Sequence, residues 1–328
     1  MKFRSLLFTF AACLLVAAIV VTGKTERRAT PQTSPREIVI TFDDLIGAPQ
    51  TSDLKLIQTI NRKLIQTITA HKIPAIGFVN EGKLFVNGGK EVAARTAILK
   101  SWVDAGLELG NHTYSHADFF NTPPARFEAD LIRGEAVTRR LLEARGKRLR
   151  YFRHPFLNTG PNLETRTAFE KFLVTRGYTV APVTVDNQDY VFAAVYASAL
   201  ARNDRAMMER VAEAYVPYME AMLELFEKHS VSLLGREMKQ TLLLHDNALN
   251  ADHFDKLVQM MKRRGYKFIS LEDALRDRAY NLPDTYTGRS GMSWLQRWAI
   301  TQQHKPTMEL FKLERDVPDF VRRSFNQR

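Results

Sequence analysis

The sequence predicts an α/β fold in which a parallel sheet is covered by helices. Short apolar segments typical of buried strands alternate with longer segments that carry apolar residues at helical spacing. Polar candidate residues follow the predicted strands at their carboxyl ends, where both (β/α) barrels and doubly wound sheets bind ligands. We expect the barrel, because five widely spaced strands must direct their ends at one place.

The N-terminal residues are expected to lie outside the catalytic fold. An apolar run from Leu6 to Val21 follows two basic residues and precedes small ones, which is typical of a signal peptide over residues 1–23. An uncleaved anchor is the alternative, since the run is slightly shorter than the ~20 residues that span a bilayer. We expect a proline-containing linker at 24–36 and export to the periplasm or cell envelope. Membrane contact is then limited to an uncleaved N-terminal segment.

The β-branched run that begins at Ile38 predicts the first buried strand, and glycines such as Gly106 predict where helices end. Strands are expected at 37–42, 73–79, 107–110, 151–153, 178–185, 241–244 and 266–270. Helices are expected at 53–71, 91–105, 124–145, 162–176, 204–229 and 252–264.

These elements define a catalytic domain over 37–280, with a helical insertion at about 193–240. The insertion either caps the site or packs on the barrel. In the C-terminal extension, residues 281–328, aromatic residues including Trp294 and Trp298 are expected to tie the segment onto the domain surface, although such residues can also stack on sugars.

The composition of the chain limits the partners and cofactors that we expect. The formal net charge is +11, but much of it is interleaved with acidic residues and no nucleic-acid-binding motif is present, so we expect a solvated basic surface and no nucleic-acid partner. The single cysteine, Cys13, lies in the N-terminal apolar run, which leaves histidine and carboxylate chemistry for the rest of the chain. The sequence contains no Walker motif and no GxGxxG, so a nucleotide cofactor has no support.

One carboxylate and two histidines suit a divalent metal. Asp44 follows the first predicted strand, and His112 and His116 follow the third. Because the histidines are four residues apart, we expect them on one side of a helical turn. One carboxylate and two imidazoles leave coordination positions open for water and substrate. Zinc is the default expectation, and nickel, cobalt or manganese would also fit.

Five segments, in this order, resemble the five motifs of the polysaccharide deacetylases, the NodB-homology enzymes of carbohydrate esterase family 4. They are Thr41-Phe42-Asp43-Asp44, His112-Thr113-Tyr114-Ser115-His116, Arg153-His154-Pro155-Phe156, Asp186-Asn187-Gln188-Asp189-Tyr190 and Leu242-Leu243-Leu244-His245. The resemblance covers about residues 36–275. It implies a distorted (β/α) barrel of about seven strands.

The resemblance also implies roles for individual residues. Asp43 would be the general base and His245 the general acid, with Asp44, His112 and His116 as metal ligands. Arg153 would hold Asp43, and Asp189 would hold Arg153 or His245. We expect substrate contacts from Tyr114, Phe156, Tyr190 and Leu243, and a backbone N–H of Tyr114 or a neighbour for the oxyanion. Tyr190 stands where the family has tryptophan, and Asp186 is expected to cap a strand end.

The resulting hypothesis is metal-dependent hydrolysis of N-acetyl groups on a hexosamine-containing glycan, whether peptidoglycan, chitin-like or an exopolysaccharide. An O-acetyl glycan esterase would use the same residues. A non-catalytic glycan-binding protein on the same scaffold is the alternative from a different class. A zincin-type peptidase is not expected, because the sequence has no His-Glu-x-x-His.

Overall fold

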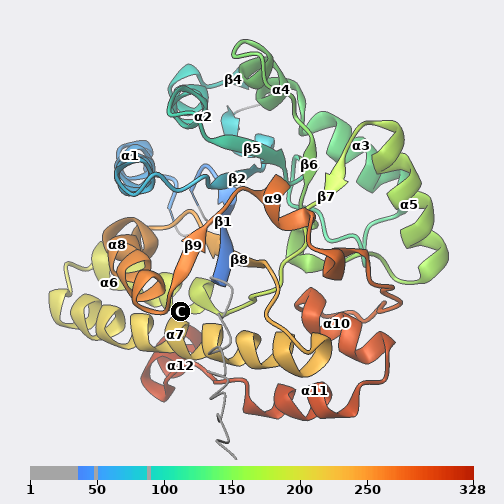
Figure 1. The fold of residues 1–328 in the computed structure, drawn as a ribbon. Helices are drawn as coiled ribbons and strands as arrows, with labels where there is room; N and C mark the ends of the chain where they lie inside the picture. The colour runs from blue at the N-terminus through green and yellow to red at the C-terminus, as the bar shows by residue number, and fades with distance from the viewer. Residues whose placement is uncertain (1–35, 48–50, 87–89) are drawn as a thin grey trace, which may run out of the picture. The chain divides into compact units, whose positions relative to one another are not determined.

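The carboxyl ends of the strands of one curved parallel sheet carry the predicted motifs. In the computed structural model, which describes residues 36–47, 51–86 and 90–328, seven strands form this sheet in the order β7-β6-β5-β2-β1-β8, with β9 paired to the start of β1 (Figure 1). Their bounds are β1 Arg36–Leu45, β2 Ile76–Val79, β5 Glu108–Asn111, β6 Tyr151–Phe152, β7 Thr179–Val180, β8 Gln240–His245 and β9 Tyr266–Phe268. All pairings within it are parallel.

The chain after β7 returns to β8 and joins the two ends of the sheet. Val185 forms an isolated parallel bridge with Leu242, and its carbonyl accepts a hydrogen bond from Leu243 N at 3.2 Å. The predicted strand 178–185 is therefore reduced to Thr179–Val180 and this bridge, because Pro182 has no N–H to donate. The prediction of a distorted (β/α) barrel is confirmed.

Helices surround the sheet and cover its apolar residues. They are α1 Leu54–Ala70, α2 Ala93–Asp104, α3 Pro124–Arg133, α4 Ala136–Glu143, α5 Leu163–Thr175, α6 Asp189–Ala201, α7 Arg205–Leu234, α8 Ala248–Arg263, α9 Leu271–Leu275, α10 Trp294–Thr301, α11 Lys305–Leu310 and α12 Asp319–Asn326. The short 3₁₀ turns are η1 Glu81–Leu84, η2 Pro155–Leu157, η3 Arg278–Asn281 and η4 Phe311–Leu313, and β3 Phe85–Val86 pairs antiparallel with β4 Lys90–Glu91.

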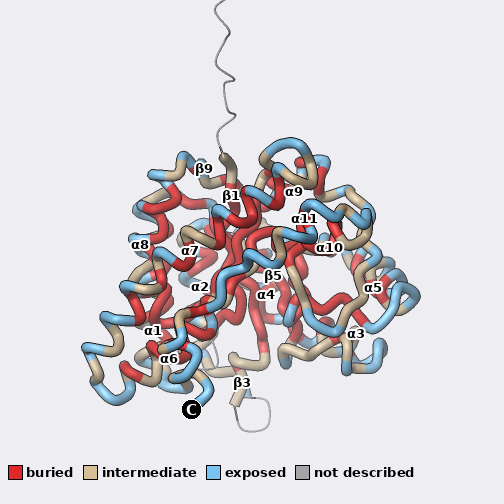
Figure 2. The backbone as a smooth tube through the Cα atoms, turned by 90° about the horizontal axis from the view of Figure 1, so that it is seen from below, coloured by how far each residue is buried: buried red, intermediate tan, exposed pale blue. Residues whose placement is uncertain are grey.

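Central strands are the most deeply buried part of the chain, as Figure 2 shows. Phe42 of β1 is fully buried and makes edge contacts with Trp102 of α2 and Phe254 of α8. Helices from two connections far apart in the chain thus share one core with the strand that carries Asp43 and Asp44. This packing fixes the end of β1, from which the site is built.

The N-terminal predictions fall outside the described residues. Residues 1–23, the expected signal peptide or anchor, and the expected linker up to Pro35 are among those not described. Arg36, which we placed in the linker, is the first residue of β1. Among the described residues, no helix is long and apolar enough to cross a bilayer.

The predicted helix 124–145 is wrong as a single element, since the structure has α3 and α4 with a break at Gly134. A Cβ atom at Gly134 would lie 2.6 Å from both Thr113 C and Tyr114 N. Contacts this short do not occur between real atoms, so only glycine lets the loop that carries the predicted histidine ligands pass so close. The break between α3 and α4 therefore allows the loop that carries His112 and His116 to pack against Gly134.

The C-terminal extension packs onto the catalytic unit, as its aromatic residues predicted. Trp298 is 1% exposed and contacts Tyr280 edge-on. The backbone N–H of Trp294 donates to Val183 O at 2.8 Å. Arg297 is fully buried and pairs with Asp284 at 2.8 Å. Figure 1 shows α10 and α11 alongside α7, and α12 lies against α6.

Replacing Trp298 by alanine tests how far this extension belongs to the folded unit. We expect the free energy of unfolding to fall by about 3–5 kcal/mol, because the change opens a large cavity in a packed interior. Chemical denaturation measures it. Leu313→Ala is the control: this side chain is 62% exposed, and we expect a change within about 0.5 kcal/mol. A loss below about 1 kcal/mol for Trp298→Ala would contradict the packing described here.

Candidate active site

Two adjacent carboxylates at the end of β1 face the same place. Side chains normally alternate along a strand, but Asp44 has φ 67° and the register between β1 and β2 shifts after Phe42. As a result, Asp43 Oδ2 lies 3.8 Å and Asp44 Oδ1 lies 4.0 Å from the same atom, His112 Nε2. Both carboxylates are thus inside β1, although the sequence placed them after it.

His112 and His116 lie on a loop, so the predicted helical turn is wrong. Thr113 and His116 have positive φ values of 65° and 58°, which reverse the chain and bring the two imidazole rings to a centroid distance of 4.9 Å. Asp130 of α3 holds the loop: its carbonyl accepts from Tyr114 N at 3.1 Å, and its carboxylate accepts from Ser115 N at 3.0 Å. The two imidazole side chains converge because Thr113 and His116 have left-handed backbone conformations, and not because they are spaced as on a helix.

Asp44, His112 and His116 converge as predicted. One ligand atom from each residue lies within 4.8 Å of the others. His112 Nδ1 is 2.8 Å from the Arg153 carbonyl oxygen, to which it donates, so Nε2 presents its lone pair to the site. The Arg153 carbonyl thus orients the His112 ring by a hydrogen bond, and the sequence did not predict this contact.

The protonation states of the three residues suit a divalent cation. Burial and the neighbouring His116 hold the pKa of His112 well below its ordinary value, and burial also lowers the pKa of His116. Burial alone would raise the pKa of Asp44, but Lys83 and His116 outweigh it and the net shift is downward. Two neutral imidazoles and one carboxylate therefore fit zinc, cobalt, nickel or manganese.

Lys83 is a component of this site that sequence reasoning missed. Its ammonium donates to Asp44 O at 2.6 Å and lies 3.6 Å from Asp44 Oδ1. It comes from η1, between the first two motifs, and no local pattern distinguishes it from a surface lysine. Its contact explains why the buried carboxylate of Asp44 stays ionised.

Arg153 lies beneath Asp43, as the resemblance implied. Its side chain is fully buried, with Nη1 3.4 Å from Asp43 Oδ2 and Nη2 donating to Thr41 Oγ1 at 3.2 Å. Burial nevertheless raises the pKa of Asp43 to about 6, against the opposing effect of Arg153. Asp43 Oδ1 is buried and makes no hydrogen bond within the described residues.

Asp189 holds His245 and not Arg153. Asp189 Oδ1 is 2.7 Å from His245 Nδ1, and its Oδ2 accepts from His245 N and from Asn250 Nδ2, each at 2.9 Å. Burial would lower the pKa of His245, but the charge and hydrogen bond of Asp189 raise it to about 9. His245 is therefore a protonated imidazolium at neutral pH, with Nε2–H available to a substrate.

One cleft of about 1030 Å³ is lined by Asp43, Asp44, Lys83, His112, His116 and His245. Three of the four predicted substrate residues lie on its walls: Phe156, which is 57% exposed, Tyr190, which is 46% exposed, and the buried Leu243. Asp186 also lines the cleft, and its carboxylate accepts from Asn187 N at 2.8 Å in a local turn.

Tyr114 is not among the residues that line the cleft, so the structure does not support its predicted substrate contact. Its hydroxyl accepts from Arg133 Nη2 at 3.0 Å, and its ring lies beneath that guanidinium and beside Phe85. The expected oxyanion donor is wrong as well, because the N–H groups of Tyr114 and Ser115 are both bound to Asp130.

C-terminal residues complete the cleft, which the sequence did not predict. Gly291, Glu314, Phe325 and Arg328 line it together with the strand-end residues. They are 46 or more positions beyond His245 in the printed sequence, and only long-range packing brings them there.

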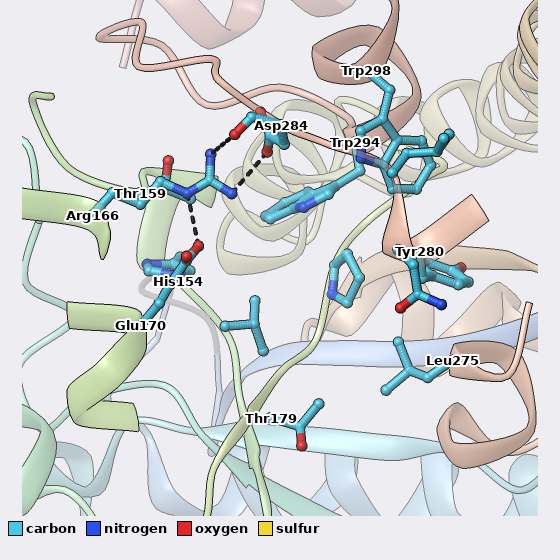
Figure 3. Close-up of a pocket in the computed structure, with 14 residues that line it drawn as sticks. His154, Thr159, Arg166, Glu170, Thr179, Leu275, Tyr280, Asp284, Trp294 and Trp298 are labelled. Carbon is cyan, nitrogen blue, oxygen red and sulfur yellow. Dashed lines mark hydrogen bonds and ion pairs between the residues drawn. The ribbon is translucent and has the colours of Figure 1, made fainter. Parts of the chain in front are cut away.

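A second cavity, of about 440 Å³, lies behind the third motif (Figure 3). His154 lines it, whereas the adjacent Arg153 is directed to Asp43. Arg166 in this cavity is paired with Glu170 and Asp284, as the dashed lines in Figure 3 show. It contains none of the predicted catalytic, metal-binding or substrate-binding residues, so His154 is not part of the candidate active site.

Comparison with known proteins agrees with this geometry. Residues 30–172 match the model of a family described as polysaccharide deacetylase. No curated protein shows significant similarity to the chain. A chitin deacetylase from the fungal pathogen Colletotrichum lindemuthianum shares the fold, with 20% identity over 75% of this chain and 89% of that chain and a TM-score of 0.50.

Two further solved structures are similar at a lower level. An acetyl xylan esterase of family 4 from Clostridium thermocellum, with a cobalt ion, is 18% identical over 73% of this chain and 90% of that chain, with a TM-score of 0.45. A CE4 family pseudoenzyme from Bacillus anthracis is 15% identical over 75% of this chain and 66% of that chain, with a TM-score of 0.48.

Replacing His116 by alanine tests the cation site without any assay of activity. We expect the purified chain to bind one divalent cation, and His116→Ala to weaken this binding by more than about 100-fold, since losing a direct ligand exceeds the 10–100-fold effect of losing an outer partner. Titration calorimetry measures both. His71→Ala is the matched control, because His71 pairs with Asp255 outside the cleft. Unchanged affinity in His116→Ala would remove this residue from the ligand set.

Proposed function

Since this chain belongs to the polysaccharide deacetylase family, we propose that it is a metal-dependent hydrolase that removes N-acetyl groups from a hexosamine-containing glycan. One observation carries the proposal: Asp43 and His245 are register partners on the adjacent strands β1 and β8, beside the Asp44, His112 and His116 triad. A base, an acid and a cation site thus open into one cleft. Metal-assisted amide hydrolysis uses these three functions together.

Asp44, His112 and His116 would hold the cation. A bound divalent cation polarises the acetyl carbonyl and lowers the pKa of a water molecule. Zinc is the ion that we propose, because two neutral imidazoles and one carboxylate are ligands that it prefers, and nickel, cobalt or manganese would be accepted by the same set.

Asp43 would accept the proton from the attacking water. Its Oδ1 has no partner among the described residues, whereas its Oδ2 lies 3.4 Å from Arg153 Nη1, and Thr41 Oγ1 accepts a hydrogen bond from Arg153 Nη2. A pKa of about 6 leaves most of the carboxylate ionised at neutral pH and still able to take up a proton. A cation held at Asp44 would lower this pKa further by its charge.

His245 would protonate the departing amine. Asp189 binds its Nδ1–H, so the second ring proton, on Nε2, is the one that can be transferred. The reaction adds water across the C–N bond: the hydroxyl joins the acetyl carbon, and the sugar nitrogen leaves as an amine with the proton from His245. Leu243 supplies apolar surface for the acetyl methyl group at the foot of the cleft.

Two alternatives use the same scaffold. An O-acetyl glycan esterase would use the same base and cation site and would depend less on an acid, because an alcohol leaves more readily than an amine. Asp189 raises the pKa of His245 and so keeps it protonated at neutral pH, which favours the amide. A non-catalytic glycan-binding protein would not require the pairings of Asp43 with Arg153 and of His245 with Asp189, and both pairs are complete. The N-terminal sequence pattern supports action outside the cytoplasm, in the periplasm or cell envelope.

Asp43→Asn separates catalysis from metal binding. We expect acetate release to fall by about 10²–10⁴-fold, the contribution typical of a general base, while metal content stays near one ion per chain. The assay compares chitin oligomers, peptidoglycan and acetylated xylan, so that the wild-type chain also distinguishes N- from O-deacetylation. Asp104→Asn, a change on the surface of α2, is the control. Wild-type rates in Asp43→Asn would refute the role of this residue.

Asp189→Asn tests the acid through the pH profile. Asp189 raises the pKa of His245 to about 9, so the imidazolium is present below that pH and is lost above it. Without the negative charge the pKa should fall, and the alkaline limb of the kcat profile should move to lower pH by one unit or more. Rates measured from pH 5 to 10 give the shift, with Asp204→Asn as the control. An alkaline limb that stays in place would exclude His245 as the acid.

A further inference from the structure

The C-terminal extension forms part of the catalytic cleft. Phe325 and Arg328, in and after α12, line the same cavity as Asp43 and His245. Residues 30–172 carry the family match, so α12 lies well outside it. Because α12 lies far from the motifs in the sequence, its residues can contact a part of the substrate that the residues at the strand ends do not contact.

We propose that Tyr190 and Phe325 form a binding subsite that stacks on a pyranose ring next to the sugar whose acetyl group is removed. This proposal rests on the proposed function and deepens it, because it makes an oligosaccharide, and not a single amino sugar, the preferred substrate.

The two rings form a corner beside the catalytic acid. The Tyr190 ring lies 6.2 Å from the His245 ring and 6.3 Å from the Phe325 ring, measured between centroids. Tyr190 and Phe325 are inclined by 77°, so their faces make two walls and not a stack. Tyr190 is 46% exposed although it begins a helix that is otherwise buried among apolar residues. The exposed ring beside a catalytic group indicates a surface kept for a ligand.

Phe325 is held in place from both sides. Val321, one turn earlier on α12, is fully buried against the core. The Arg328 guanidinium lies 4.7 Å from the centroid of the Phe325 ring, and its Nη1 donates to Ala194 O of α6 at 2.9 Å. The corner therefore exists before a ligand binds, which reduces the entropy cost of binding.

The groups around the corner suit a sugar ring. One face of a pyranose carries C–H groups that are apolar and slightly positive, which complements the negative face of an aromatic ring. Glu314, Asp186 and Arg328 line the same cleft and can form hydrogen bonds with sugar hydroxyls.

Phe156 gives the glycan a direction. It contacts His116 at a centroid distance of 4.4 Å and is 57% exposed, on the metal side of the cleft. The corner of Tyr190 and Phe325 lies on the acid side. A cleft of about 1030 Å³ is at the upper end of the range for small-ligand sites, about 300–1,000 Å³, and leaves room for more than one sugar.

The test measures binding of chitotetraose by calorimetry in an Asp43→Asn background, which prevents turnover. Phe325→Ala and Phe325→Leu should each weaken binding about tenfold, or ~1.4 kcal/mol. The leucine variant keeps apolar packing on α6 and removes only the ring. In the catalytic wild-type background, kcat/KM for the tetramer should fall toward the value for the dimer in both variants.

Phe320→Ala is the matched control. Phe320 lies on the same helix and is likewise partly buried against the core, but its ring lies under Arg210 and it does not line the cleft. We expect this variant to keep the affinity and the preference for the tetramer. Equal weakening in Phe320→Ala and Phe325→Leu, or unchanged binding in Phe325→Leu, would overturn the subsite.

Failure of the proposed function gives a different result. A wild-type chain that binds chitotetraose but releases no acetate, with metal bound, would refute the deacetylase and leave the comparison of Phe325 and Phe320 valid as a binding test. A wild-type chain that releases acetate from the dimer and the tetramer at equal kcat/KM would refute the subsite and leave the deacetylase standing.

Discussion

The site depends on one backbone constraint: the positive φ at Asp44, at the end of β1. In a regular strand, Asp43 and Asp44 would face opposite sides of the sheet, and the protein could place either a base or a ligand beside His112, but not both. The irregular register with β2 lets both carboxylates approach His112 Nε2 within 4.0 Å. The catalytic scheme follows from this geometry.

Bringing two carboxylates into a buried site carries an electrostatic cost, which two cations offset. Arg153 lies beneath Asp43 and Lys83 lies beside Asp44. The net effect of burial and of these charges differs between the two carboxylates. Burial still raises the pKa of Asp43, whereas the pKa of Asp44 is lowered. One carboxylate can therefore exchange a proton and the other can remain a ligand, as the chemistry requires of a base and of a ligand.

Chemistry and substrate recognition come from different parts of the fold. The proposed base, acid and ligands lie at the ends of β1 and β8 and after β5, strands that share one core. The aromatic walls come from η2, from the start of α6 and from α12, which are peripheral to the sheet. Such a division allows the reaction to stay the same while the peripheral segments determine which glycan enters the cleft.

The sequence by itself determined the alternation of strands and helices and located the candidate cation ligands and the proposed base and acid. These follow from local periodicity and from motifs whose residues lie at strand ends, and the parallel sheet brings strand ends together. Tertiary structure decided the rest. The spacing of His112 and His116 fits a helical turn and a reversed loop equally well, and contacts of that loop with Asp130 and Gly134, far along the chain, favour the second. Lys83, Phe325 and Arg328 have no local signature, because their place in the cleft depends on packing between segments far apart in the chain.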